Sequence, residues 1–172
     1  PVPRSAPTDA NTLAECVSEA ADLFNRATCP VMLAGVELAR FGLGTETLKL
    51  VEHAEIPFAT MLSSKCLLPE LHPQFIGIYQ GGWSREAVRR QVESSDCLLS
   101  LGVRMTDLDS GLFSVNLDNR RMIDAATGQV RISNHFFHNV QLGDFIRALT
   151  AAVHPRSYLK SHPLQSYTPR AP

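Results

Sequence analysis

Three short apolar runs constrain the fold most, because each is bounded by turn residues and lies between segments of helical pattern. They are VMLA (31–34), FATM (58–61) and CLLSL (97–101), and the first and third are followed directly by Gly35 and Gly102. An apolar run without alternation predicts a strand that is buried on both faces, which is typical of parallel sheets. Weaker strand candidates are FIGI (75–78), RMIDA (121–125) and VRI (130–132).

Four amphipathic segments separate or follow these runs, and each predicts a helix. The first starts at Thr12, where Thr12 and Glu15 have the spacing of a capping box, and the third starts at Ser84, a residue type favoured as N-cap. The second and fourth cover residues 45–55 and 142–153. This alternation predicts an α/β fold with three layers, a doubly wound and mostly parallel sheet flanked by helices.

Both ends of the 172-residue chain are rich in proline and lack periodicity. We therefore interpret residues 1–11 and 154–172 as linkers, and residues 12–153 as one folded domain. The chain starts with Pro1 rather than Met, from which we expect it to be part of a longer polypeptide.

Charge and cysteine content exclude several classes of partner. The chain has 16 Lys and Arg against 17 Asp and Glu, a net charge of −1, so neither nucleic acid nor an anionic membrane is an expected partner. No apolar stretch is long enough to span a membrane. The four cysteines lack metal-binding spacing and are interpreted as structural, which makes a reducing cytoplasm the expected location.

Candidate site residues lie after the predicted strands, because ligands of open α/β sheets bind beyond the carboxyl ends of the strands. Gly35 and Gly102 end two strands, and Arg104, Thr106 and Asp107 follow the second glycine. They indicate either a crevice for a phosphate-bearing ligand or tight turns with capping aspartates. The glycine fingerprint of dinucleotide-binding domains is absent, which favours tight turns at Gly35 and Gly102, whereas both interpretations stay open for the segment with Arg104, Thr106 and Asp107.

Another polar pattern is the pair His135 and His138, separated by two phenylalanines. Two imidazoles at this spacing can share a metal, but no third ligand is evident, so packing is the preferred interpretation. We assign no catalytic residue and no metal ligand.

Several motifs in order, taken together, resemble one known family. They are AGVELARFGL (34–43), SKCLLPELHP (64–73), GIYQG (77–81), VESSDCLLSLG (92–102) and MTD (105–107). The similarity extends over about residues 9–153 and identifies the chain as similar to the central domain of thiamine diphosphate-dependent 2-oxo acid decarboxylases, in the indolepyruvate and pyruvate decarboxylase branch. Such domains have a Rossmann-like fold of the DHS-like NAD/FAD-binding type.

The resemblance implies that the catalytic parts lie elsewhere. Family members bind thiamine diphosphate and Mg²⁺ through an N-terminal pyrimidine-binding domain and a C-terminal diphosphate-binding domain with a G-D-G motif. Here LGDF (142–145) has Phe145 where that motif needs glycine. The resemblance therefore predicts a structural or regulatory central domain without cofactor of its own, in a homo-oligomeric parent. The alternative left open is a free-standing module that binds FAD, ADP or NAD.

Overall fold

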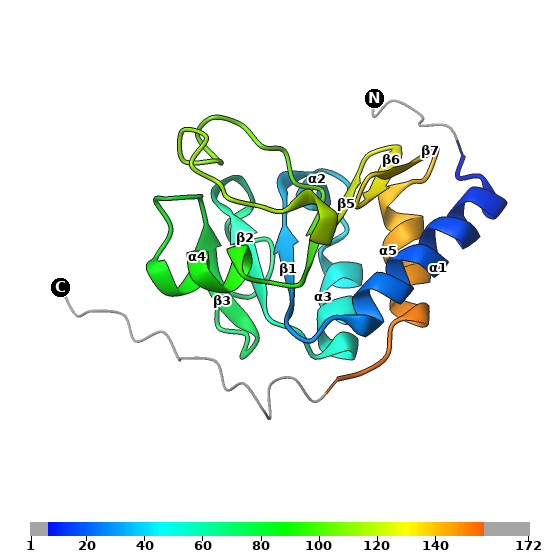
Figure 1. The fold of residues 1–172 in the computed structure, drawn as a ribbon, viewed down its shortest axis with the longest axis horizontal. Coiled ribbons are helices and arrows are strands. Elements are labelled where there is room, and N and C mark those ends of the chain that lie inside the picture. The colour runs from blue at the N-terminus through cyan, green and yellow to red at the C-terminus, as the bar shows by residue number, and fades with distance from the viewer. Residues whose placement is uncertain (1–6, 157–172) are drawn as a thin grey trace.

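The computed structural model describes residues 7–156, which form one seven-stranded sheet with helices on both faces (Figure 1). The strands run in the order β3-β2-β1-β4-β5-β6-β7. Their bounds are β1 Pro30–Ala34, β2 Phe58–Met61, β3 Phe75–Tyr79, β4 Cys97–Leu101, β5 Met122–Ala126, β6 Gln129–Ile132 and β7 His135–His138. The first five strands in this order are parallel, and β6 and β7 pair antiparallel. The predicted doubly wound, mostly parallel sheet is confirmed.

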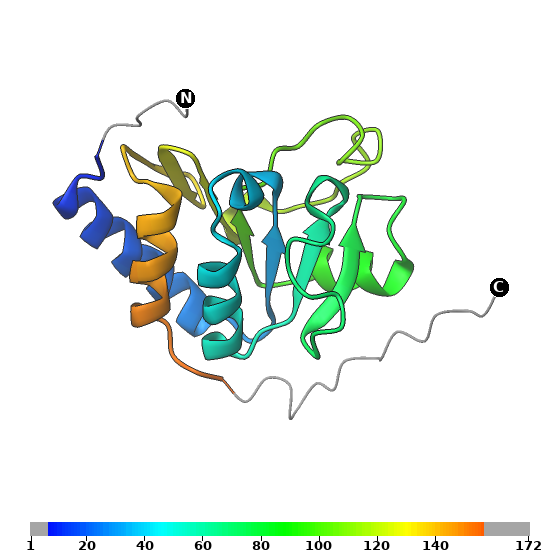
Figure 2. The ribbon, with the colours of Figure 1, turned by 180° about the vertical axis from the view of Figure 1, so that it is seen from behind.

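Three long helices cover one face of the sheet and a single helix covers part of the other (Figures 1 and 2). The first group consists of α1 (Ala10–Arg26), α3 (Gly44–Ala54) and α5 (Leu142–Ala152), and the opposite helix is α4 (Glu86–Glu93). A short helix, α2 (Val36–Arg40), follows β1, and two 3₁₀ turns, η1 (Leu62–Ser64) and η2 (Asn119–Arg121), precede β3 and β5. Within residues 7–156, no helix has the length and apolar character needed to cross a membrane.

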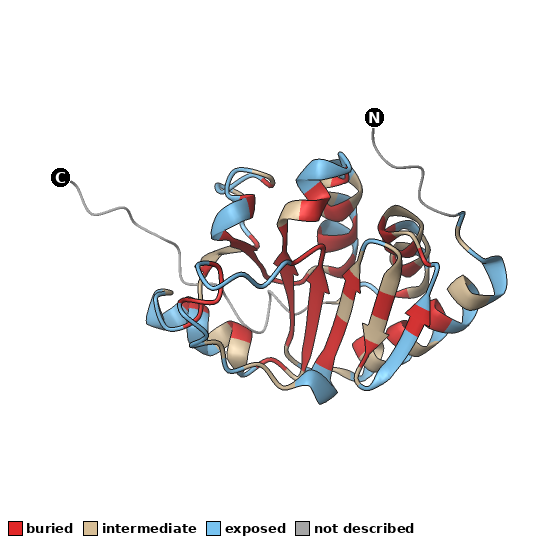
Figure 3. Cartoon of the chain, turned by 90° about the horizontal axis from the view of Figure 1, so that it is seen from above, coloured by how far each residue is buried: buried red, intermediate tan, exposed pale blue. Residues whose placement is uncertain are grey.

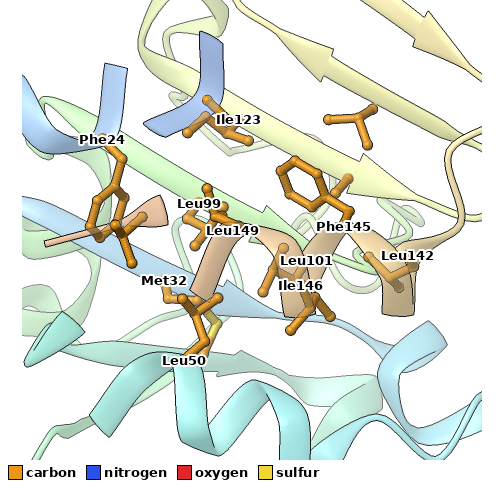
Figure 4. Close-up of a cluster of buried hydrophobic side chains, with 14 of the residues drawn as sticks. Phe24, Met32, Leu50, Leu99, Leu101, Ile123, Leu142, Phe145, Ile146 and Leu149 are labelled. Carbon is orange, nitrogen blue, oxygen red and sulfur yellow. The ribbon is translucent and has the colours of Figure 1, made fainter. Parts of the chain in front are cut away.

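The alternation of side chains along the strands divides the core into two clusters. The larger cluster joins Met32, Leu99 and Ile123 of the sheet to Leu50 of α3 and Phe145 of α5 (Figure 4). The smaller cluster lies under α4 and is built on the opposite faces of the same strands. Every residue of β1 and β4 is buried, so these strands form the centre of the sheet (Figure 3).

The structure corrects the predicted start of the first helix. Asp9 rather than Thr12 is the N-cap, because its carboxylate accepts a hydrogen bond from the Thr12 amide at 2.8 Å, and the helix begins at Ala10, inside the predicted linker. At the other end of the domain, Arg156 lies in the predicted tail but donates to the carbonyls of Phe24 and Ala27. Residues 157–172 lie outside the described residues, so that part of the tail interpretation stays a prediction.

The start of the third predicted helix is also corrected. Its N-cap is Arg85, and the hydroxyl of Ser84 instead accepts a hydrogen bond from the Gln80 amide at 2.7 Å. Trp83, which stands where a hydrophobic staple with Val88 would have its outer residue, is 55% exposed. Ser84 therefore belongs to a turn at residues 80–84 that precedes the helix, and the helix begins at Glu86.

Asp96 links two loops at the amino ends of β1 and β4. Its carboxylate accepts hydrogen bonds from the Thr28 amide and hydroxyl at 2.6 and 2.7 Å and from the Cys29 amide at 2.8 Å. Partial burial alone would raise the pKa of Asp96, but the hydrogen bonds from Thr28 and Cys29 outweigh it, so the pKa is lowered from 3.8.

A lowered carboxylate pKa makes a stabilising contribution at neutral pH that is lost as pH falls through the folded-state value. We expect the Asp96→Asn variant to be less stable than the unmodified chain at pH 7, and the two to converge between about pH 5 and pH 2. Urea denaturation at a series of pH values measures this. Asp22→Asn, on the exposed face of α1, controls for the change in net charge. Two curves that stay parallel to acid pH would contradict the assignment.

Candidate functional site

The strand order reverses between β1 and β4, which is where an open α/β sheet normally provides its ligand crevice. Here the two strand ends are joined to each other. The Gly35 amide donates to the Leu101 carbonyl at 2.8 Å, and the Glu37 amide donates to the Gly102 carbonyl at 3.0 Å. A Cβ on Gly35 would lie only 2.2 Å from the Gly102 carbonyl oxygen. Both glycines are therefore used for close backbone contact, and no room is left between them for a ligand.

Glu37 lies at this junction and was not singled out from the sequence. Its carboxylate, in a residue only 4% exposed, accepts hydrogen bonds from the Thr127 amide at 2.8 Å and the Thr127 hydroxyl at 2.9 Å. Its other oxygen is 3.5 Å from the guanidinium of Arg104. A buried carboxylate beside the strand ends would repel the phosphates of a nucleotide. The geometry at Gly35 and Gly102 thus gives no support to the FAD, ADP or NAD alternative.

The contacts of Glu37 lead to a prediction for stability. Glu37→Ala would remove the buried carboxylate that accepts hydrogen bonds from the Thr127 amide and hydroxyl, and we expect a loss of about 2 kcal/mol in the free energy of unfolding. Arg104 is 62% exposed, so Arg104→Gln should cost less than about 1 kcal/mol. Urea denaturation of both variants tests this ranking. An Arg104→Gln variant that loses as much stability as Glu37→Ala would contradict it.

The segment after Gly102 is fastened by its own polar side chains. The Thr106 hydroxyl donates to the Asp109 carboxylate at 3.0 Å, and Asp109, 5% exposed, also accepts from the Ser63 amide at 3.3 Å. Asp107 is exposed, and its carbonyl accepts from the Leu112 amide at 2.8 Å. Of the predicted candidates, only Arg104 and Thr106 therefore border a common space, and Asp107 stands outside it.

That space is a cavity of about 540 Å³ on the sheet face opposite the three long helices. It lies over β4 and β5, where residues 103–121 connect the two strands without an α-helix (Figure 1). Ser100, Asp124 and Arg131 face it from the sheet, and Val115 and Leu117 from the connection. We call it the β4–β5 cavity. The sequence pattern did not indicate it, because its lining residues come from three strands and a long loop.

The same connection carries an exposed apolar patch. Leu108, Leu112 and Phe113 are 57%, 65% and 79% exposed. Leu112 and Phe113 also have positive φ angles of 55° and 63°, a conformation that is uncommon for bulky residues. The patch is anchored from behind, because the Gln80 side chain donates to the Leu108 carbonyl at 2.9 Å and the Ser114 hydroxyl accepts from the Gly82 amide at 2.7 Å. Exposed apolar patches of this kind are typical of interaction surfaces.

The two histidines of the H-x-x-H pattern lie on strand β7, where residues three apart point to opposite faces. His135 pairs with Glu19 of α1 at 2.8 Å and contacts the ring of Phe137. These contacts support the packing interpretation. Across residues 7–156, no group of three or more His, Cys, Asp or Glu side chains is placed to hold a metal ion.

The cysteines lie within the described residues and form no disulfide. Burial raises the pKa of the Cys16 thiol to about 12, with a further contribution from Glu19. Burial likewise raises the pKa of the Cys97 thiol to about 12, with a contribution from Asp96. A thiol that stays protonated at neutral pH is a poor nucleophile and metal ligand, which agrees with a structural role for these two residues.

Comparison with known proteins places this fold in a family. Residues 17–152 match the family described as "Thiamine pyrophosphate enzyme, central domain". Pyruvate decarboxylase isozyme 2 of Saccharomyces cerevisiae is 31% identical over 147 residues, which cover 86% of this chain and 26% of the yeast protein. An alpha-keto-acid decarboxylase of Mycobacterium leprae is 35% identical over 134 residues, which cover 78% of this chain and 23% of that protein.

The chain thus spans about a quarter of the length of these decarboxylases. The matched segment includes the whole seven-stranded sheet, helices α2 to α5 and the C-terminal part of α1. Its order of strands and its helix layers agree with the match. On these grounds, the chain belongs to the family of thiamine pyrophosphate enzyme central domains.

Proposed function

We propose that residues 12–153 form a structural or regulatory central domain of a thiamine diphosphate- and Mg²⁺-dependent 2-oxo acid decarboxylase. Its partners would be a pyrimidine-binding domain and a diphosphate-binding domain of the same enzyme, in a cytoplasmic homo-oligomer. The observation that carries the proposal is the family match over 17–152 in a chain that corresponds to about a quarter of its decarboxylase relatives.

Two structural observations support a scaffold role. The crevice at which a Rossmann-like sheet would bind a ligand is closed by the Gly35–Gly102 contact and by Glu37. The exposed side chains of Leu108, Leu112 and Phe113 form an apolar patch in the connection that follows the carboxyl end of β4. Burying such side chains against a neighbouring domain is favourable at about 25 cal/mol per Å². When bound by the whole enzyme, thiamine diphosphate supplies the chemistry that removes CO₂ from a 2-oxo acid.

Calorimetric titration of the 172-residue chain with thiamine diphosphate and Mg²⁺ tests whether this chain binds the cofactor without the other two domains. We expect no measurable heat of binding and no CO₂ release from pyruvate or indolepyruvate, because no metal-holding side-chain group occurs among the described residues. Micromolar binding of the cofactor to this chain would overturn the proposal.

A chimera tests the scaffold role directly. Residues 7–156, which include the helix cap Asp9 and Arg156, would replace the corresponding segment of yeast pyruvate decarboxylase isozyme 2, and we expect a folded chimera to decarboxylate pyruvate. Phe113→Glu in the same chimera should lower activity by weakening domain contact, whereas Leu71→Glu, at an exposed position away from the patch, should not. A folded but inactive chimera with native side chains would contradict the proposal.

A further inference from the structure

The β4–β5 cavity exists because one crossover lacks its helix. In the β3–β4 crossover, α4 packs Val88 and Val92 on the sheet. In the β4–β5 crossover, residues 103–118 contain no helix, and Val115 and Leu117 are only partly buried against the same cluster. The connection arches over the strands (Figure 1) and borders an open cavity of about 540 Å³, a volume within the range of small-molecule sites.

The floor of the cavity is polar although it is the centre of the sheet. Ser100 is 1% exposed, and its hydroxyl donates to the Asp124 carboxylate at 2.8 Å. The Arg131 side chain, 15% exposed, donates to the Ser133 carbonyl at 2.9 Å and reaches Asp124 only at 3.5 Å. A guanidinium has five N–H donors, so these two contacts leave donors of Arg131 for another acceptor.

The remaining lining is of two kinds. Val103, Met105, Leu117 and Met122 provide apolar walls, and Arg104 with Thr106 stands at the rim. The guanidinium groups of Arg104 and Arg131 and the carboxylate of Asp124 therefore line the cavity. The guanidinium of Arg104 also pairs with Glu37, which does not line the cavity. The surplus of donors over acceptors suits an anionic acceptor group, while the walls suit a compact apolar body.

We propose that the β4–β5 cavity binds a small organic carboxylate with a compact apolar body, whose carboxylate contacts Arg131 and whose body packs on Val103, Leu117 and Met122. A planar carboxylate matches the fork of a guanidinium, whereas inorganic phosphate would leave the apolar walls in contact with water. A cationic ligand would meet two guanidinium groups. The inference concerns this chain alone and does not depend on the proposed decarboxylase role.

The test uses the ¹⁵N-labelled 172-residue chain and phenylacetate as the probe, followed by amide chemical shifts. We expect saturable shifts at Ser100, Met122 and Asp124 at millimolar phenylacetate. The neutral analogue phenylacetamide should bind at least about tenfold more weakly, because it lacks the charge that a guanidinium recognises. Arg131→Gln should weaken phenylacetate binding by a similar factor.

Two further variants keep the test decisive if Arg131→Gln does not fold. Leu117→Trp, on the arched connection, should fill the cavity and abolish the shifts, and Arg120→Gln, which removes an 80% exposed guanidinium paired with Asp118, should leave binding unchanged. Absence of saturable shifts in the unmodified chain would overturn the proposal. Equal binding of phenylacetamide, or unchanged binding in the Leu117→Trp variant, would also overturn it.

Discussion

The Gly35→Ala variant is expected to lose about 4 kcal/mol or more of unfolding free energy, a large part of what a domain of this size has. The added Cβ would lie 2.2 Å from the Gly102 carbonyl oxygen and 2.3 Å from the Val103 Cα. Both are backbone atoms beside the central strand pair, so the clash cannot be relieved by rotating a side chain. Urea denaturation followed by far-ultraviolet circular dichroism measures the loss.

Gly44→Ala is the matched control for this substitution. Gly44 is the first residue of α3, and the nearest atoms to an added Cβ belong to Leu67 at 3.5 Å, an ordinary contact distance. Alanine is favoured over glycine in a helix by up to about 1 kcal/mol, so this variant should be as stable as the unmodified chain or slightly more so. A Gly35→Ala variant as stable as Gly44→Ala would show that the strand ends do not meet as described.

Phe145→Ala is expected to lose about 3–5 kcal/mol, because it removes a fully buried aromatic ring and leaves a cavity. Phe145 is 0% exposed and joins α5 to the larger cluster, with Leu142, Ile146 and Leu149 of the same helix lining the contact (Figure 4). Since α5 packs against both α1 and α3, the loss should appear as one cooperative shift of the urea midpoint.

Phe136→Ala is the control for the loss of a ring. Phe136 lies on β7 and is 51% exposed, so its truncation should change stability by no more than about 0.5 kcal/mol. Equal losses in the two phenylalanine variants would contradict the position of the larger cluster between the helices and the sheet.

The sequence predicted those elements whose residues are buried in a regular pattern. VMLA, FATM and CLLSL became β1, β2 and β4, and the weaker candidates became β3, β5 and β6. Strand β7 and helix α2 were not predicted. In β7 only Phe137 is buried, so no period of two is visible, and α2 has only five residues, too few to show a helical period.

The candidate site could be predicted only in part, because its contacts join distant segments. Strand-end glycines indicated that Gly35 and Gly102 have special backbone roles, but nothing local indicated that they touch each other. Glu37 binds Thr127, 90 positions along the chain, and the cavity floor joins Ser100 to Asp124 across two strands. The only local signal for Glu37 is a carboxylate two positions after a strand-ending glycine.

The arched connection of residues 103–121 gives the two sides of this domain different resilience. The helical side is tied together by a large continuous cluster, whereas the arch contributes buried Val103 at its start and the partly buried Val115 and Leu117 to the smaller cluster beneath it. Opening the arch therefore exposes little apolar surface and leaves the other layer untouched. Amino-acid changes in the arch can thus alter its local opening and the ligands it contacts with little effect on the stability of the rest of the fold. The arch side of the sheet therefore tolerates more sequence change than the side covered by α1, α3 and α5.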